Sequence, residues 1–119
     1  MMTSGFTALE KTALDEIASQ YPAHRACLEA QFTAANVVSR ENTGARFYTR
    51  FIVDRTAVPA VSCDRVIGQV WADIDGFNSP MTFLLFTTEG YANCLEGAAI
   101  DDSTTGIDFS AIKFKLIQP

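Results

Sequence analysis

The chain is poor in the residues and motifs that most enzymes and membrane proteins depend on. His24 is its single histidine, so a nucleophile–histidine system would have to include it, and one chain cannot supply a multi-histidine metal site. The sequence contains no G-x-x-x-x-G-K-[ST], G-x-G-x-x-G or G-x-S-x-G motif. We therefore expect no catalytic residue, no bound metal and no cofactor, and we expect that the protein is not an enzyme.

Cysteine is also scarce. Cys27, Cys63 and Cys94 are far apart and lack C-x-x-C spacing, which fits neither a disulfide framework nor a zinc site. We expect Cys27, in a helix, and Cys94, in a strand, to be small buried apolar residues. Cys63 is expected in a loop.

Basic residues and long apolar runs are few as well. The chain has nine Lys and Arg residues and 14 Asp and Glu residues, which gives a net charge of −5. An acidic chain is a poor candidate for nonspecific nucleic-acid binding. No run approaches the roughly 18–20 apolar residues that cross a bilayer. The N-terminal segment, MMTSGFTALEKT, lacks the basic and apolar parts of a secretory signal. We expect no nucleic-acid partner, no membrane association and a cytoplasmic location.

The composition that remains is that of a small globular domain. The chain has 119 residues, of which 48% are apolar and 19% are charged. This length leaves room for a single core, so we expect one domain over 1–119, with helices over about 7–34 and a sheet over about 36–117.

Two helices are expected first. Thr7 and Glu10 have capping-box spacing, and the apolar positions that follow, from Leu14 to Tyr21, form one helical face up to about Gln20. Glu10 is expected to be exposed to solvent. Pro22 interrupts the pattern and can begin a second helix that runs to about Ala34; one kinked helix is the alternative.

Beyond residue 36 the apolar period changes to two, which indicates about five or six mostly antiparallel strands and an α+β fold. Gly68 indicates a bulge or a close approach of the backbone. The expected strands cover residues 36–40, 46–53, 66–74, 81–88, 91–100 and 112–117.

The stretch 81–100 reads as two central strands joined at Glu89-Gly90. Phe83, Leu85 and Phe86 cannot all be covered from one side, and the helices can cover only one face. Either the sheet curls on itself or a second subunit covers the other face, so a homodimer is one of the two expected arrangements.

Two segments resemble a group of small, uncharacterised bacterial proteins. VVSRENTGARFYTRF (37–51) matches their S-R-E-x-T-G-x-x-F-x-T hairpin, and FLLFTTEGYANCLEG (83–97) matches their F-x-L-F…G…L-E-G hairpin. The resemblance covers about two-thirds of the chain and implies the same fold. It implies no activity.

The strongest candidate for a binding site is on the first hairpin. Arg40, Arg46 and Arg50 cluster there, and Arg46, Tyr48 and Arg50 share one strand face, which places forked donors beside an aromatic ring. Glu96 is expected to need a basic partner if it is buried. This face suits an acidic protein surface or a small anionic ligand, and its alternative is an ordinary solvated face with ion pairs.

Strand-end carboxylates give the second candidate. Asp73, Asp101 and Glu96 could form an acid–base pair or an oxygen-rich cation site if their strand ends meet. The main interpretation is thus a non-enzymatic interaction protein that binds through Arg46, Tyr48, Arg50 and Glu96. The alternative is a small enzyme or ligand pocket built on the carboxylates, and a structural dimer without any ligand would exclude both.

Overall fold

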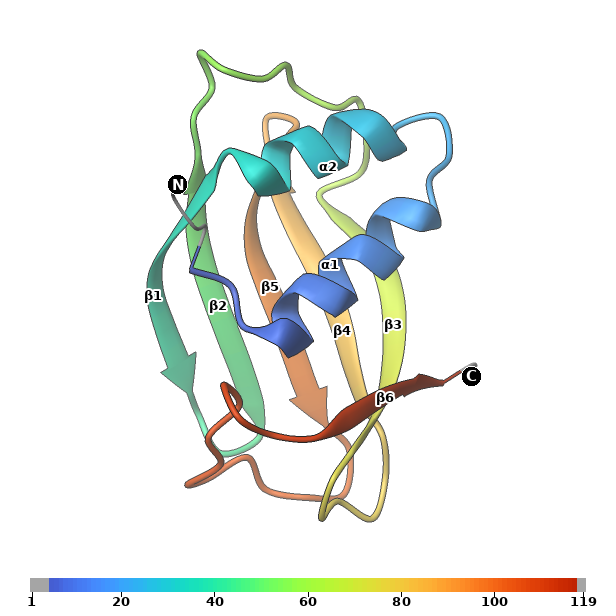
Figure 1. Cartoon of the computed structure of the whole chain (residues 1–119), viewed down its shortest axis with the longest axis vertical. Coiled ribbons are helices and arrows are strands. Elements are labelled where there is room, and N and C mark those ends of the chain that lie inside the picture. Colours follow the sequence, from blue (N-terminus) through green and yellow to red (C-terminus); the bar gives the residue numbers. More distant parts are fainter. Residues whose placement is uncertain (1–4, 118–119) are drawn as a thin grey trace.

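A computed structural model of the chain, which describes residues 5–117, confirms the α+β class. Two helices pack on a six-stranded sheet in which every neighbouring pair of strands is antiparallel (Figure 1). The elements are α1 (Ala8–Ser19), α2 (Arg25–Thr33), β1 (Ala35–Asn42), β2 (Arg46–Val53), β3 (Val66–Ile74), β4 (Met81–Thr88), β5 (Tyr91–Ala99) and β6 (Phe114–Ile117).

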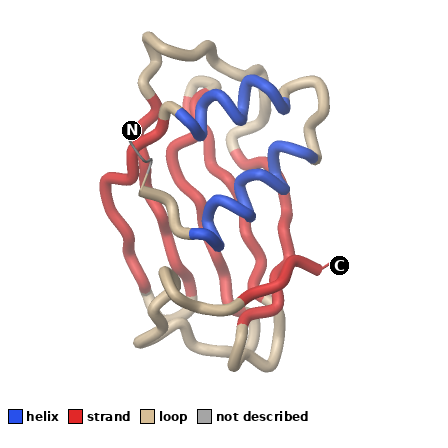
Figure 2. The backbone as a smooth tube through the Cα atoms, in the orientation of Figure 1, coloured by secondary structure: helices blue, strands red, loops and turns tan. Residues whose placement is uncertain are grey.

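The strand order is β1-β2-β5-β4-β3-β6. The β4–β5 hairpin therefore lies at the centre, as predicted, and the connections β2–β3 and β5–β6 cross the two ends of the sheet. Both helices lie on the same face of the sheet (Figure 2). The other face has no helix over it among the described residues.

The core lies between the helices and the central strands. Leu14 and Ile17 of α1 and Phe83 and Leu85 of β4 are all at most 1% exposed. Phe83 and Leu85 are two positions apart and point to the same side, so the helices cover both. Only Phe86, of the three apolar residues singled out above, is on the helix-free side, where it is half-buried.

The helices are separate, and the second is shorter than predicted. Residues 21–24 form a turn in which the His24 N–H donates to the Tyr21 carbonyl at 2.9 Å, so α2 begins at Arg25 rather than near Pro22. Cys27 of α2 is half-buried rather than fully buried, and Cys63 is half-buried in a loop; Cys94 is buried, as predicted.

Glu10 corrects one prediction. The capping box between Thr7 and Glu10 is present, but the Glu10 side chain is 2% exposed rather than solvated. Its carboxylate accepts from the Arg40 guanidinium at 2.7 and 2.9 Å and from the Thr49 hydroxyl at 2.6 Å. These bonds attach the start of α1 to β1 and β2.

Two glycines are required by close packing. Gly68 has φ of +79°, and a Cβ there would lie 2.7 Å from the side chain of Ile17, so both features predicted at this position are present: a bulge and a close approach. The bulge turns Ile67 toward the core, whereas strict alternation along the strand would place it on the same face as Trp71. A Cβ at Gly97 would lie 2.7 Å from the Phe83 ring.

Candidate interaction surface

The helix-free face of the sheet, called the open face below, brings the predicted binding residues together. Two cross-strand rows run through its middle, and a third lies beside them. The first row is Glu41–Tyr48–Glu96–Leu84, the second is Ser39–Arg50–Cys94–Phe86–Val66, and the third is Arg46–Ala98–Thr82–Trp71–Ile117. Residues that are paired in register share a face, so each row lies on the open face.

One half of this face, over β1, β2 and β5, is charged. Arg46 donates to the Glu96 carboxylate at 3.2 Å, and Arg50 donates to the Glu41 carboxylate at 3.0 Å. The Arg50 guanidinium also lies 5.2 Å from the centre of the Tyr48 ring, within cation–π range. Both arginines remain about half exposed, so their guanidinium groups can still be reached from solvent.

Glu96 is the buried charged residue of this half, with 8% of the residue exposed. Its partner is Arg46, which is a basic residue as expected for a buried Glu96. Partial burial, together with the negative charge of Glu96, raises the pKa of the neighbouring Tyr48 phenol. Burial likewise raises the pKa of the Cys94 thiol. Tyr48 and Cys94 are therefore neutral at pH 7 and act as polar contacts rather than charges.

The other half, over β4, β3 and β6, is mainly apolar; its charged residues are Asp73 and Lys115, which are paired in register between β3 and β6. Leu84, Phe86, Trp71 and Ile117 are each half-buried, and Val66 is 44% exposed. The Trp71 indole N–H is buried and has no hydrogen-bond partner. Aromatic residues in strands are more often core than surface residues, and the sequence alone does not show that Trp71 and Phe86 lie on the face that the helices leave open.

Arg40 is not part of the open face. A bulge in β1 shifts the register between Val37 and Ser39, which turns Arg40 toward the helices, where it pairs with Glu10. The predicted cluster of three arginines therefore consists of Arg46 and Arg50 alone.

The predicted carboxylates do not converge. Across the sheet, Asp73 is two strands from Glu96, and along the strands it is four residues further on, which separates their Cα atoms by roughly 16 Å. Asp101 accepts from the Ser79 hydroxyl at 3.1 Å, and Asp102 accepts from the Asn78 and Ser79 N–H groups, so both acids order the β3–β4 turn. Within residues 5–117, no group of three His, Cys, Asp or Glu is placed to hold a metal ion.

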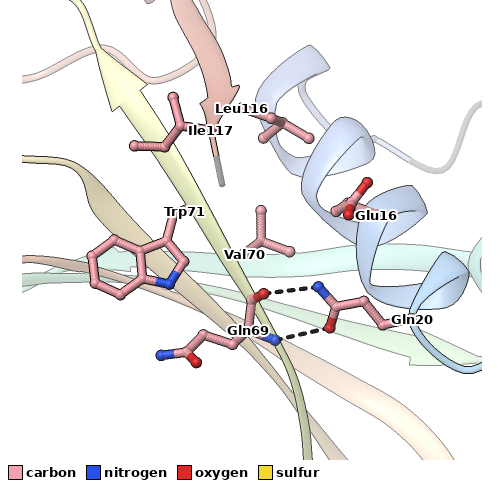
Figure 3. Close-up of a pocket in the computed structure, with 7 residues that line it drawn as sticks. All are labelled: Glu16, Gln20, Gln69, Val70, Trp71, Leu116 and Ile117. Carbon is pink, nitrogen blue, oxygen red and sulfur yellow. Dashed lines mark hydrogen bonds between the residues drawn. The ribbon is translucent and has the colours of Figure 1, made fainter. Parts of the chain in front are cut away.

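A hollow of about 120 Å³ lies at the β3 edge, where β6 ends (Figure 3). The Gln20 amide occupies one side of it, donating to the Gln69 carbonyl at 2.8 Å and accepting from the Gln69 N–H at 3.2 Å. Gln20 thus pairs with backbone groups that a further strand would otherwise meet. Trp71 and Ile117 point to the opposite side of β3 from the helix (Figure 3).

No protein-family model, curated protein or solved structure matches this chain. His24 immediately precedes α2 and is half-buried, away from the open face. Over the described part of the chain, no helix has the length and apolar content needed to span a membrane. The open face is therefore the feature of this chain that bears on its function.

Proposed function

We propose that this protein is a non-enzymatic interaction protein whose open face binds a protein partner. The observation that carries the proposal is the division of one helix-free sheet face into an apolar half and an Arg/Tyr/Glu half. Aromatic residues and arginine are the types enriched in protein–protein interfaces, and half-buried apolar groups bordered by charges are typical of them.

A small anionic ligand is the weaker candidate for this face. Arg46 and Arg50 already donate to Glu96 and Glu41, so a free anion would have to compete with carboxylates that are held in place. A protein surface can instead bury the apolar half and exchange ion pairs at the same time.

Capture of the partner tests the proposal. The wild-type chain and an Arg46→Ala/Arg50→Ala variant are immobilised and exposed to a lysate of the cells that produce the chain. We expect the variant to lose about tenfold or more of the captured partner. Loss of the exposed Arg50–Glu41 pair should change the free energy of unfolding by about 0–1 kcal/mol, whereas Arg46→Ala should lower the Tm because it leaves the buried Glu96 without its partner. Capture is therefore compared at a temperature at which circular dichroism shows both proteins to be folded.

The matched control is Arg25→Ala/Arg55→Ala. These arginines form exposed ion pairs with Glu29 and Glu89, at 3.1 and 2.8 Å; Arg25 is on α2 and Arg55 is in the loop after β2, so neither belongs to the three rows. The control makes the same change in net charge and should capture the partner as the wild type does. Equal capture by the Arg46→Ala/Arg50→Ala variant, or no partner for the wild type, would overturn the proposal.

A further inference from the structure

The open face has the size of a small dimer interface. Five of its six strands have 8 or 9 residues. With a strand spacing of about 4.8 Å and a rise of about 3.3 Å per residue, the face covers roughly 600 Å². Two such faces together bury roughly 1,200 Å², the lower end of the standard range for specific interfaces.

The charges of this face balance although those of the whole chain do not. Its outward-facing charged residues are three acids and three bases: Glu41, Asp73, Glu96, Arg46, Arg50 and Lys115. The chain carries a net charge of −5, so the excess of negative charge lies elsewhere. A strongly charged partner would find no net charge to match here, whereas two copies could meet face to face without net repulsion.

The order of residues across the two central rows is self-complementary. Two copies can be stacked with their open faces together and related by a twofold axis that lies between the sheets. This axis runs across the strands, parallel to the rows, and passes between the Tyr48 row and the Arg50 row. It places Arg50 of each copy over Tyr48 of the second copy, within reach of Glu41 and Glu96. The same operation places Phe86 over Leu84, so apolar groups meet apolar groups.

We infer that the open face takes a second copy of this chain and forms a symmetric dimer in which the two sheets pack face to face. The inference rests on the proposed function and names the partner of that site. The apolar half packs on its own copy over one side of the interface, and Arg50 on the Tyr48 ring supplies a directional contact on the other. The helices of both copies remain on the outside.

The mass of the protein in solution tests this inference. Sedimentation equilibrium from about 1 µM to about 1 mM should show the mass rising from 13.0 kDa to twice that value. Leu84→Lys places a cation in the apolar half and should weaken association at least 100-fold. Ile52→Lys is the second variant; Ile52 is 62% exposed, so its substitution leaves folding intact while adding a charge to the face.

Ile100→Lys is the matched control, since Ile100 is 50% exposed and lies beyond the end of β5. It should dimerise like the wild type. A wild-type chain that stays monomeric throughout, or a dimer that persists in both Leu84→Lys and Ile52→Lys, would overturn the inference. If the chain is monomeric but captures another protein only while Arg46 and Arg50 are intact, the second copy is excluded and the proposed function stands.

Discussion

At the scale of single residues, Glu10 combines a helix cap with a buried ion pair. Burial by itself raises the pKa of the Glu10 carboxyl, but hydrogen bonds from Arg40, Thr49 and the Thr7 backbone outweigh burial and lower this pKa below 4.5. The ionised carboxylate therefore stabilises the folded state, and no other side chain connects α1 to both β1 and β2 in this way within the described residues.

We predict that Glu10→Gln lowers the free energy of unfolding by about 2 kcal/mol at pH 7, because Arg40 loses its charged partner while staying partly buried. Since the folded-state pKa is lowered, the wild-type contribution is present above about pH 4.5 and disappears as the pH falls through the folded-state value. Urea unfolding at a series of pH values should show the two proteins converging in acid.

Asp15→Asn is the control for this series, because Asp15 is an exposed acid on the same helix. It should change the free energy of unfolding by less than about 0.5 kcal/mol. Wild-type and Glu10→Gln curves that stay parallel down to low pH would contradict the assigned role.

At the scale of elements, Gln31 holds α2 to the sheet. Its side chain is fully buried; the amide nitrogen donates to the carbonyls of Pro59 and Gly90 at 3.0 and 2.9 Å, and the amide oxygen accepts from the Ala92 N–H at 2.9 Å. One side chain thus joins α2 to the β2–β3 loop and to the β4–β5 hairpin. The Gly90 carbonyl also accepts from the Val61 N–H at 2.8 Å, so the loop and the hairpin are joined at this point as well.

Gln31→Leu should lower the free energy of unfolding by about 3 kcal/mol, because it removes three hydrogen bonds of a fully buried side chain at roughly 1 kcal/mol each, one of them from the N–H of buried Ala92. Chemical denaturation measures the change. Gln20→Leu is the matched control: Gln20 also bonds to strand backbone, but it is exposed, so water replaces it and the cost should stay below about 1 kcal/mol. An equal decrease in the free energy of unfolding for both variants would contradict the expectation that burial makes the Gln31 hydrogen bonds more stabilising than those of Gln20.

At the scale of the whole molecule, the two faces of the sheet differ in what covers them. The helices close one face around Phe83 and Leu85, and the other carries half-buried Leu84, Phe86 and Trp71 without a helix over them. The inferred dimer would make the stability of the folded state increase with protein concentration, because a second copy binds only the folded chain.

The Tm should therefore rise by about 5 °C over a hundredfold increase in protein concentration. Thermal unfolding followed by circular dichroism at the two concentrations measures this shift. Leu84→Lys should show no such dependence, and Ile100→Lys should retain it. A wild-type Tm that does not change with concentration would exclude a dimer coupled to folding.

Several features of this protein could be predicted from local sequence, because they depend on neighbouring residues. The capping box at Thr7 begins α1, the period of two from Arg46 to Val53 places Arg46, Tyr48 and Arg50 on one face, and Gly68 marks a bulge. Each depends on a few successive side chains and their steric or hydrogen-bonding preferences, so no distant contact is needed.

Only the tertiary structure decided which residues from distant segments meet. Glu96 reaches Arg46 because β5 pairs with β2, 50 positions away. Arg40 leaves the open face because one extra residue in β1 reverses the alternation, and Glu10 is buried because Arg40 then meets it. Strand order and a single bulge depend on the packing of the whole sheet against the helices, and packing energies of that kind are spread over many residues rather than encoded at one.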